Sequence, residues 1–229
     1  MIHTSPTHLD SRKDVLTPAD AYDAASVRYD EWKWQAFWRS TEAPFVLNTI
    51  GRHTDAERDS LLDVGCGTGF YLKELQPYFR SSVGIDVSQG MLSIARARAP
   101  LSEFIHADSA EFRSNTRFDV VLCTRVLSHL EDYRISLRMM MQMLKPKGLL
   151  LISNVDASHP YELTKLPTAD GSVMAATFKH RQSSINEYLK LAGMQLISDA
   201  VFCDDASSPV TNLSAAHAKL GWASAFQFI

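Results

Sequence analysis

The fold is decided by a stretch of ten residues, Leu61-Leu62-Asp63-Val64-Gly65-Cys66-Gly67-Thr68-Gly69-Phe70. Its apolar first half predicts a buried strand, and three alternating glycines lead from that strand into a helix. Glycine is needed where the backbone takes positive φ or lies against a ligand without a Cβ between them. The unpaired N–H groups at the start of the helix suit a carboxylate as well as a phosphate. This pattern predicts a ligand site at the tip of the strand.

The spacing of the glycines separates this loop from two common nucleotide-binding loops. The dinucleotide fingerprint is G-x-G-x-x-G, whereas here the third glycine comes one residue early and Phe70 occupies its place. No Lys-Ser/Thr pair follows the loop, which excludes a P-loop. A nicotinamide-dependent reductase is therefore disfavoured.

Two carboxylates follow the next two predicted strands. Asp86 ends the run Val83-Gly84-Ile85, and Asp108 follows Ile105-His106-Ala107. Open α/β sheets bind ligands across the carboxyl ends of adjacent strands. We expect Asp86 to accept hydrogen bonds from both hydroxyls of a ribose and Asp108 to accept one from an adenine amino group.

From residue 60 onward, short apolar runs alternate with helical patterns. Strands are expected at 61–64, 82–86, 103–107, 118–123, 149–154, 194–202 and 223–229, and helices at 71–78, 88–99, 131–144 and 183–191. Such alternation builds parallel strands joined by right-handed crossovers. The pattern predicts an α/β, Rossmann-like, doubly wound sheet.

The chain is expected to divide into a disordered tail (1–16), an N-terminal helical lid (17–55) and a core (56–229) with a substrate loop at about 157–177. The substrate loop contains two prolines and a glycine, and we expect a long loop with a short helix there. In the lid, Thr17 and Pro18 are expected to begin a helix, and Pro44 is expected to begin a second one.

Four ordered motifs resemble those of the class I S-adenosylmethionine (SAM)-dependent methyltransferases. Motif I of that family resembles Asp63 to Gly69, and its ribose- and adenine-contacting segment resembles Gly84-Ile85-Asp86-Val87-Ser88 with Met91. The position at the adenine edge matches Ala107-Asp108-Ser109. The fourth strand and the approach to the fifth resemble Phe118-Asp119-Val120-Val121 and Leu144-Lys145-Pro146-Lys147-Gly148. The resemblance covers about residues 60–155, and the lid is similar to that of small-molecule, ubiquinone/menaquinone methyltransferase-like enzymes. It implies a seven-stranded sheet whose last strand is antiparallel.

The resemblance also implies a set of cofactor-binding residues. These are Tyr22, Tyr29, Asp63, Gly65, Cys66, Gly67, Gly69, Asp86, Val87, Met91, Asp108, Ser109 and Cys123. Asp63 could instead brace the loop, and Cys123 could also be a small buried filler. Tyr22 and Tyr29 lie seven apart, so both can project from one helix face and close over the methionine end, or simply dock the lid.

Candidates for catalysis and acceptor binding are fewer. His129, just beyond the fourth strand, could accept a proton or merely brace its loop. Arg125 could pair with a substrate carboxylate or phosphate, or form a salt bridge to the sheet edge or the N-terminal helix. Trp32, Trp34 and Trp38 could form an apolar wall or, with a cationic amine substrate, a cation–π surface, with packing as the alternative for at least two of them. His180 could border the acceptor pocket or be solvated.

Composition narrows the class of protein. Charged residues make up 21%, the net charge is -3, and the chain has three cysteines without a CxxC pair. The sequence has no dense run of Lys and Arg, so we expect no nucleic-acid or anionic-membrane partner. It also has no Cys/His cluster, so we expect no bound metal. With no secretory signal or membrane-spanning apolar run in the sequence, we expect a cytoplasmic protein.

The sequence thus predicts methyl transfer from SAM to an O or N atom of a small-molecule metabolite, with S-adenosyl-L-homocysteine (SAH) as product and no metal. The alternative is a SAM-binding protein of the same fold that does not methylate, such as a cyclase or a regulatory partner. The sequence makes no prediction of oligomeric state.

Overall fold

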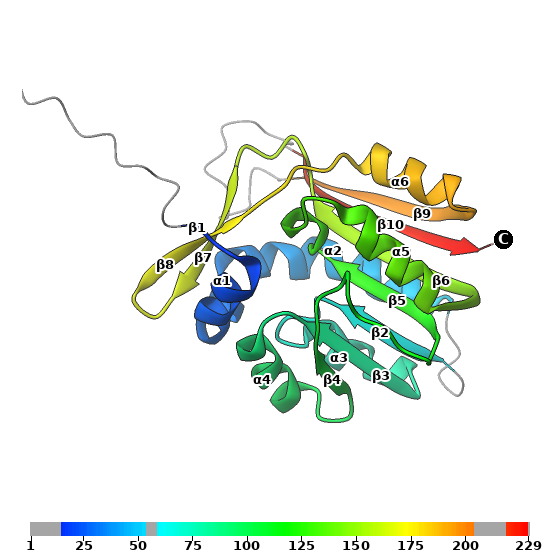
Figure 1. The fold of residues 1–229 in the computed structure, drawn as a ribbon, viewed down its shortest axis with the longest axis horizontal. Helices are drawn as coiled ribbons and strands as arrows, with labels where there is room; N and C mark the ends of the chain where they lie inside the picture. Colours follow the sequence, from blue (N-terminus) through cyan, green and yellow to red (C-terminus); the bar gives the residue numbers. More distant parts are fainter. Residues whose placement is uncertain (1–14, 54–58, 204–218, 229) are drawn as a thin grey trace, which may run out of the picture.

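The computed structural model describes residues 15–53, 59–203 and 219–228. Its centre is a seven-stranded sheet with the order β4-β3-β2-β5-β6-β10-β9 (Figure 1). The strands are β2 (Ser60–Val64), β3 (Ser81–Asp86), β4 (Glu103–His106), β5 (Phe118–Thr124), β6 (Leu144–Val155), β9 (Met194–Cys203) and β10 (Lys219–Phe228). Neighbours from β4 to β6 pair in parallel, whereas β10 is antiparallel to both β6 and β9. The predicted doubly wound sheet with an antiparallel last strand is confirmed.

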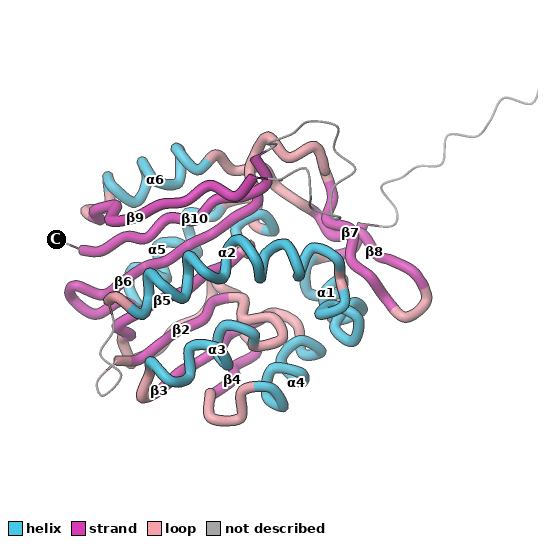
Figure 2. Tube along the Cα trace, turned by 180° about the vertical axis from the view of Figure 1, so that it is seen from behind, coloured by secondary structure: helices cyan, strands magenta, loops and turns pink. Residues whose placement is uncertain are grey.

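Helices cover both faces of the sheet, which explains why the central strands are apolar throughout. Figure 1 shows α5 (Tyr133–Met143) and α6 (Gln182–Leu191) over one face, and Figure 2 shows α2 (Lys33–Gly51) and α3 (Phe70–Leu75) over the other. A 3₁₀ turn, η2 (Gln76–Tyr78), follows α3, and η3 (Leu127–His129) follows β5. The helix α4 (Gln89–Arg98) crosses between β3 and β4 and is capped by Ser88, whose hydroxyl accepts a hydrogen bond from the Met91 N–H at 3.0 Å.

The lid consists of α1 (Pro18–Ala25), the 3₁₀ turn η1 (Ser26–Glu31) and α2. Thr17 caps α1 through the Asp20 N–H at 3.2 Å, with Pro18 in the first turn, as predicted. The expectation that Pro44 begins a helix is wrong, because Pro44 lies inside α2. A proline within a helix costs about 3 kcal/mol. Full burial of Val46 and Ile50 on the same helix stabilises it by about 1.5–3 kcal/mol each, which offsets that cost.

A second, three-stranded sheet lies beside the lid, with the order β1-β8-β7. Its strands are β1 (Val15–Leu16), β7 (Leu163–Thr168) and β8 (Gly171–Ala176). The expected loop with a short helix at 157–177 is therefore wrong, and residues 15–16, assigned to the tail, form a strand; residues 1–14 lie outside the described residues. The buried Leu166 and Ala175 pack on α1, and β1 pairs with β8 over a long separation in sequence, which local patterns do not reveal.

Candidate active site

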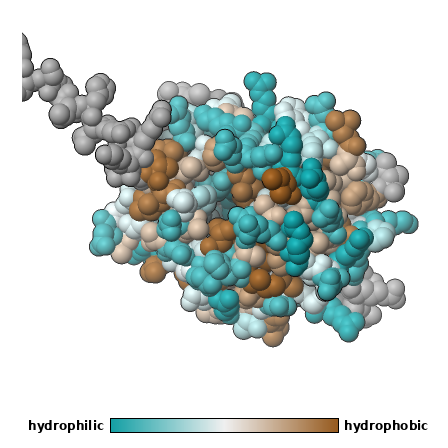
Figure 3. All heavy atoms as spheres, viewed as in Figure 1, coloured by the Kyte–Doolittle hydropathy of each residue, from teal (hydrophilic) through white to brown (hydrophobic). Residues whose placement is uncertain are grey.

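A cavity of about 760 Å³ opens at the carboxyl ends of the parallel strands, beneath the lid. This volume is typical of small-molecule sites. Figure 3 shows a hollow near the middle of this face, bordered by both hydrophobic and hydrophilic side chains. Eleven residues singled out from the sequence line it: Tyr22, Tyr29, Trp38, Gly65, Gly67, Asp86, Val87, Asp108, Ser109, Arg125 and His129. The fold thus brings together residues from the lid, from the glycine loop after β2, and from the ends of β3, β4 and β5.

The glycine loop has the left-handed backbone that its sequence predicts. Gly65 has φ +70°, and a Cβ built there would stand 2.1 Å from Cγ2 of Val126. Gly67 has φ +53°, but a Cβ there would meet nothing closer than a ring carbon of Tyr29 at 3.9 Å. Gly65 is therefore required by packing as well as by backbone conformation, whereas Gly67 faces open cavity.

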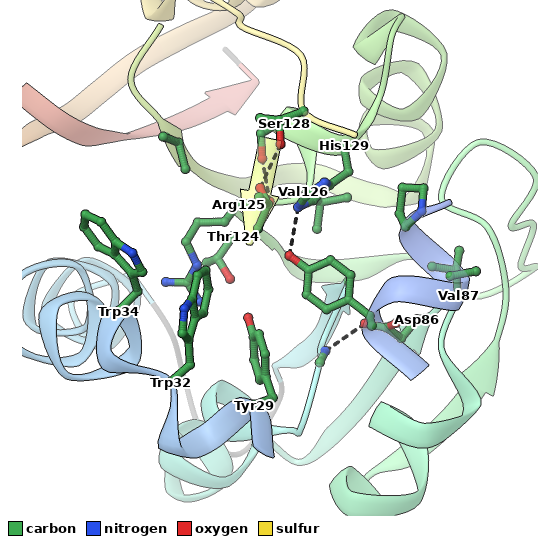
Figure 4. A pocket seen from close by; sticks show the side chains of 18 of the residues that line it. Tyr29, Trp32, Trp34, Asp86, Val87, Thr124, Arg125, Val126, Ser128 and His129 are labelled. Carbon is green, nitrogen blue, oxygen red and sulfur yellow. Dashed lines mark hydrogen bonds between the residues drawn. The ribbon is translucent and has the colours of Figure 1, made fainter. Parts of the chain in front are cut away.

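Asp86 joins the tip of β3 to the glycine loop. Its carboxylate accepts hydrogen bonds from the N–H groups of Gly67 and Ser88, both at 2.9 Å. Burial raises the pKa of Asp86, while those two N–H donors oppose the rise. Figure 4 shows Asp86 and Val87 together on one side of the cavity.

Asp63 is a buried carboxyl group for which the described residues offer no hydrogen-bond partner. It lies beneath the loop, 1% exposed, and neither carboxyl oxygen has a partner within the described residues. Burial, and then the charge of Asp86, raise the pKa of Asp63 to about 8, although Arg125 opposes this. Such a group is suited to a cationic or hydrogen-donating partner.

A second cavity of about 40 Å³ lies between α2 and the glycine loop. It shares Tyr29, Trp38, Gly65 and Arg125 with the larger one and has room for a water molecule or a carboxylate. Two buried donors on its wall, Gln35 Nε2 and Arg39 Nε, have no partner in the part of the chain that the structure describes. Its donor set is that of an anion site.

Arg125 sits at the end of β5 with φ +60°, an uncommon conformation for a residue other than glycine. Its guanidinium pairs with the fully buried Glu42 of α2 and lies 5.2 Å from the ring centre of Trp38. Glu42 also accepts hydrogen bonds from the hydroxyls of Tyr71 (2.7 Å) and Ser153 (2.6 Å). Of the two roles considered for Arg125, the salt bridge to the N-terminal helix is present.

We expect Glu42→Gln to lower the free energy of unfolding by about 3–5 kcal/mol, because it leaves the Arg125 charge buried without a counter-ion. Urea unfolding followed by circular dichroism measures the loss. Glu31→Gln is the matched control, since the Arg28–Glu31 pair is more than half exposed on both sides, and we expect no measurable change there. Equal effects of the two substitutions would contradict a structural role for the buried pair.

His129 connects the hairpin formed by β7 and β8 to α1 of the lid. Its Nδ1 lies 3.0 Å from the carbonyl oxygen of Ala176, and its Nε2 lies 2.8 Å from the hydroxyl of Tyr22. Because a carbonyl only accepts, Nδ1 carries the proton and Nε2 accepts the hydrogen bond from Tyr22. Burial lowers the pKa of His129, and the ring is neutral at physiological pH. The cavity therefore contains a neutral imidazole nitrogen with its lone pair toward a tyrosine of the lid.

The remaining sequence candidates lie outside the large cavity. Cys66 lines the small cavity, Cys123 is buried inside β5, and Met91 is buried on α4. Gly69 packs against Ala95. His180 donates from Nε2 to the Leu130 carbonyl at 2.7 Å and stands edge-on to Tyr133, so it braces the region behind the cavity. In the sequence, Asp204 and Asp205 follow the strand predicted at 194–202 and could face the pocket or form a plain turn; both lie outside the described residues.

The sequence did not predict the cavity residues contributed by the hairpin β7–β8 and by the segment that leads into it. His159, Tyr161, Leu163 and Lys165 all line the cavity. The sequence indicated the segment by its length and its prolines, but not which side chains would face the lid. An aromatic residue and a histidine beside Pro160 were the available signal.

In the described part of the chain, no group of three or more His, Cys, Asp or Glu side chains is placed to hold a metal ion. Within the same residues, no helix has the length and apolar character needed to cross a membrane.

Comparison with known proteins gives a consistent result. A family model described as "Methyltransferase domain" matches residues 62–152. Over those residues the chain is similar to the methyltransferase domain family, in agreement with the resemblance of its motifs to class I SAM-dependent enzymes. The matched residues include the glycine loop, Asp86, Asp108 and His129, which are the features that line the cavity.

Curated relatives of this methyltransferase domain include a mitochondrial ubiquinone biosynthesis O-methyltransferase from Schizosaccharomyces pombe, 28% identical over 54% of this chain and 50% of its own length. A dTDP-3-amino-3,6-dideoxy-alpha-D-glucopyranose N,N-dimethyltransferase from Streptomyces fradiae is 39% identical over 36% of this chain and 32% of its own. This chain thus spans half or less of these relatives. The N-methyltransferase NodS from Bradyrhizobium japonicum WM9, solved with SAH, shares the fold with a TM-score of 0.66 and 18% identity, over 92% of this chain and 97% of that one.

Proposed function

We propose that this protein binds SAM in the large cavity and transfers its methyl group to an O or N atom of a small molecule, releasing SAH. The observation that carries the proposal is the convergence of the glycine loop, Asp86 and Asp108 on one cavity of about 760 Å³. The named activities of the relatives, O-methylation in ubiquinone biosynthesis and N,N-dimethylation of an amino sugar nucleotide, support small-molecule acceptors.

The unpaired polar groups fit the cofactor. Asp86 would hold the ribose and Asp108 the adenine. Asp63, which lacks a partner within the described residues, would stabilise the amino end of the methionine moiety, and the donors of Gln35 and Arg39 would suit its carboxylate. When bound, SAM supplies a methyl group on a sulfonium, which is already a good leaving group. We propose that Tyr22 and Tyr29, both on the lid, close over the methionine end of the cofactor.

The chain's own contribution to chemistry is positioning and proton transfer. The lid and hairpin exclude water from a nucleophile held in the cavity. We propose that Nε2 of His129 accepts the proton that the acceptor loses, with Nδ1 fixed by Ala176. Tyr22, which donates to Nε2 at 2.8 Å, holds the ring neutral until the acceptor displaces the tyrosine hydroxyl.

The pH dependence follows from the environment of His129. Its neutral form is the active one, and burial lowers its pKa, so we expect kcat/KM to be flat at neutral pH and to fall only as the pH drops through that lowered pKa. Tyr22→Phe removes a donor that favours the neutral ring, so the pKa should rise and the acid limb should move to higher pH. His129→Gln should abolish the limb and reduce kcat by roughly 10²- to 10⁴-fold.

Nuclear magnetic resonance titration of the His129 ring gives its pKa without an acceptor, and SAH formation gives the kinetics. If the pKa of His129 is unchanged in Tyr22→Phe, or if His129→Gln retains full activity, His129 does not act as the base and only holds its loop in place.

Calorimetric titration of the purified chain with SAM, SAH and NADH tests the proposed function. We expect saturable binding of SAM and SAH, no heat with NADH, and SAH formation with an acceptor. Tight SAM binding without SAH formation from any acceptor would favour the non-methylating alternative. The division into lid (17–55) and core (56–229) and the cytoplasmic location remain predictions from the sequence.

A further inference from the structure

The end of the cavity opposite Asp86 is aromatic. Trp34 stands 5.6 Å from the ring of His159 and 6.2 Å from that of Tyr161, measured between ring centres. Trp32 continues this wall, at 6.0 Å from Tyr29. Figure 4 shows Trp32 and Trp34 across the cavity from Asp86 and Val87. Flat rings facing a cavity at these distances suit a planar, apolar molecule.

The charges that line the cavity are separated by sign. In the part of the chain that the structure describes, the carboxylates that line the cavity are Asp86 and Asp108. Both lie at the end proposed to bind the ribose and adenine, which we call the nucleoside end. The aromatic end carries Lys33, between the two tryptophans, and Lys165 on β7, which packs against η1. Both lysines are exposed at the rim and form no ion pair within the described residues, whereas Arg125 is neutralised by Glu42. The acceptor end is thus a positive rim around an aromatic wall.

His159 adds a hydrogen-bond donor to that wall. Its Nδ1 accepts the Tyr161 N–H at 3.2 Å, so the neutral ring carries its proton on Nε2, which has no partner among the described residues. Burial, together with the nearby Lys179, lowers the pKa of His159 to about 4. The ring is therefore a neutral donor throughout the physiological range. It can bond an oxygen acceptor such as a carboxylate.

We propose that the methyl acceptor is a planar aromatic molecule carrying a carboxylate, with the ring against Trp32 and Trp34 and the carboxylate between Lys33, Lys165 and His159. This inference rests on the proposed function. A cationic amine, considered from the sequence for the three tryptophans, is disfavoured, because no carboxylate of the described residues lines this end and the guanidinium of Arg125 already covers the Trp38 ring.

The test is calorimetric titration of the SAH-loaded protein with three molecules that share one ring system: 2-naphthoate, 2-naphthamide and 2-naphthylmethylammonium. Loading with SAH occupies the cofactor's own carboxylate site, so the comparison reports the acceptor end. We expect 2-naphthoate to bind roughly tenfold tighter than the amide, as a charge-assisted contact of about 1.4 kcal/mol gives, and the ammonium to bind weakest.

Variants locate the effect. Lys33→Gln/Lys165→Gln should bring the naphthoate and amide within about threefold, whereas the matched control Lys73→Gln/Lys190→Gln, two exposed lysines away from the cavity, should keep the full preference. His159→Phe, which retains an aromatic ring, should weaken naphthoate binding severalfold.

Three outcomes overturn the proposal: the naphthoate binds no tighter than the amide, none of the three binds up to its solubility limit, or the control double variant loses the preference as fully as the cavity one. The same titrations on the protein without SAH keep the two proposals separable. Failure of SAH to bind would refute the proposed function, while the charge preference would still be measured directly.

Discussion

Asp86→Ala is expected to weaken SAM and SAH binding by about 10²- to 10⁴-fold. A carboxylate that accepts two hydroxyl hydrogen bonds in a half-buried site contributes about 1.5–3 kcal/mol per bond, and each 1.4 kcal/mol is tenfold in affinity. The carboxylate already lies at the cavity wall, positioned by the N–H groups of Gly67 and Ser88. Isothermal titration calorimetry with SAH measures the change.

The substitution also removes two hydrogen bonds within the protein, so a loss of fold must be separated from a loss of ligand contact. Asp119→Ala is the matched control, because Asp119 accepts hydrogen bonds from Ser60 and Lys145 and does not line the cavity. Both variants should lower the melting temperature, but only Asp86→Ala should lose SAH affinity. Unchanged affinity in a folded Asp86→Ala protein would refute the ribose assignment.

Gly65→Ala is expected to lower the free energy of unfolding by about 2–5 kcal/mol and to abolish detectable SAH binding. The left-handed backbone at φ +70° costs an alanine about 1–2 kcal/mol, and its Cβ would stand 2.1 Å from Val126, so the loop must move at a further cost of about 1–3 kcal/mol. Chemical denaturation and calorimetry with SAH report the two effects.

Gly67→Ala separates the backbone cost from the clash. It has a similar φ of +53° but no atom within 3.9 Å of its Cβ, so it should lose only about 1–2 kcal/mol of stability. Its methyl group would still protrude into the cavity and weaken SAH binding. Adding Val126→Ala to Gly65→Ala should recover part of the lost stability. Wild-type stability and affinity in Gly65→Ala would contradict the packing described for the loop.

The sequence predicted those features that depend on neighbours along the chain. The strand-glycine-helix pattern around Gly65, and the carboxylates of Asp86 and Asp108 at strand ends, follow from local periodicity and from the rule that parallel strands end at one edge. The topology of the sheet followed from the same alternation. These features form the nucleoside end of the cavity.

The features that the sequence missed depend on partners far away in the chain. The hairpin β7–β8 is held by residues 15–16 and by α1, and Pro44 is tolerated because Val46 and Ile50 are buried by other elements. Likewise, His159 reaches the cavity only because its segment folds over Trp34. Such long-range packing carries no periodic signal, so the acceptor end could not be derived from sequence.

The most direct test of the central claim, that the glycine loop and the two strand-end carboxylates bind one adenosyl group, is a crystal structure of the protein grown with SAH. We expect continuous ligand density across the carboxyl ends of β2, β3 and β4, with the ribose hydroxyls on Asp86 and the adenine beside Asp108. A cavity without ligand density at saturating SAH, or SAH bound elsewhere on the molecule, would contradict the claim.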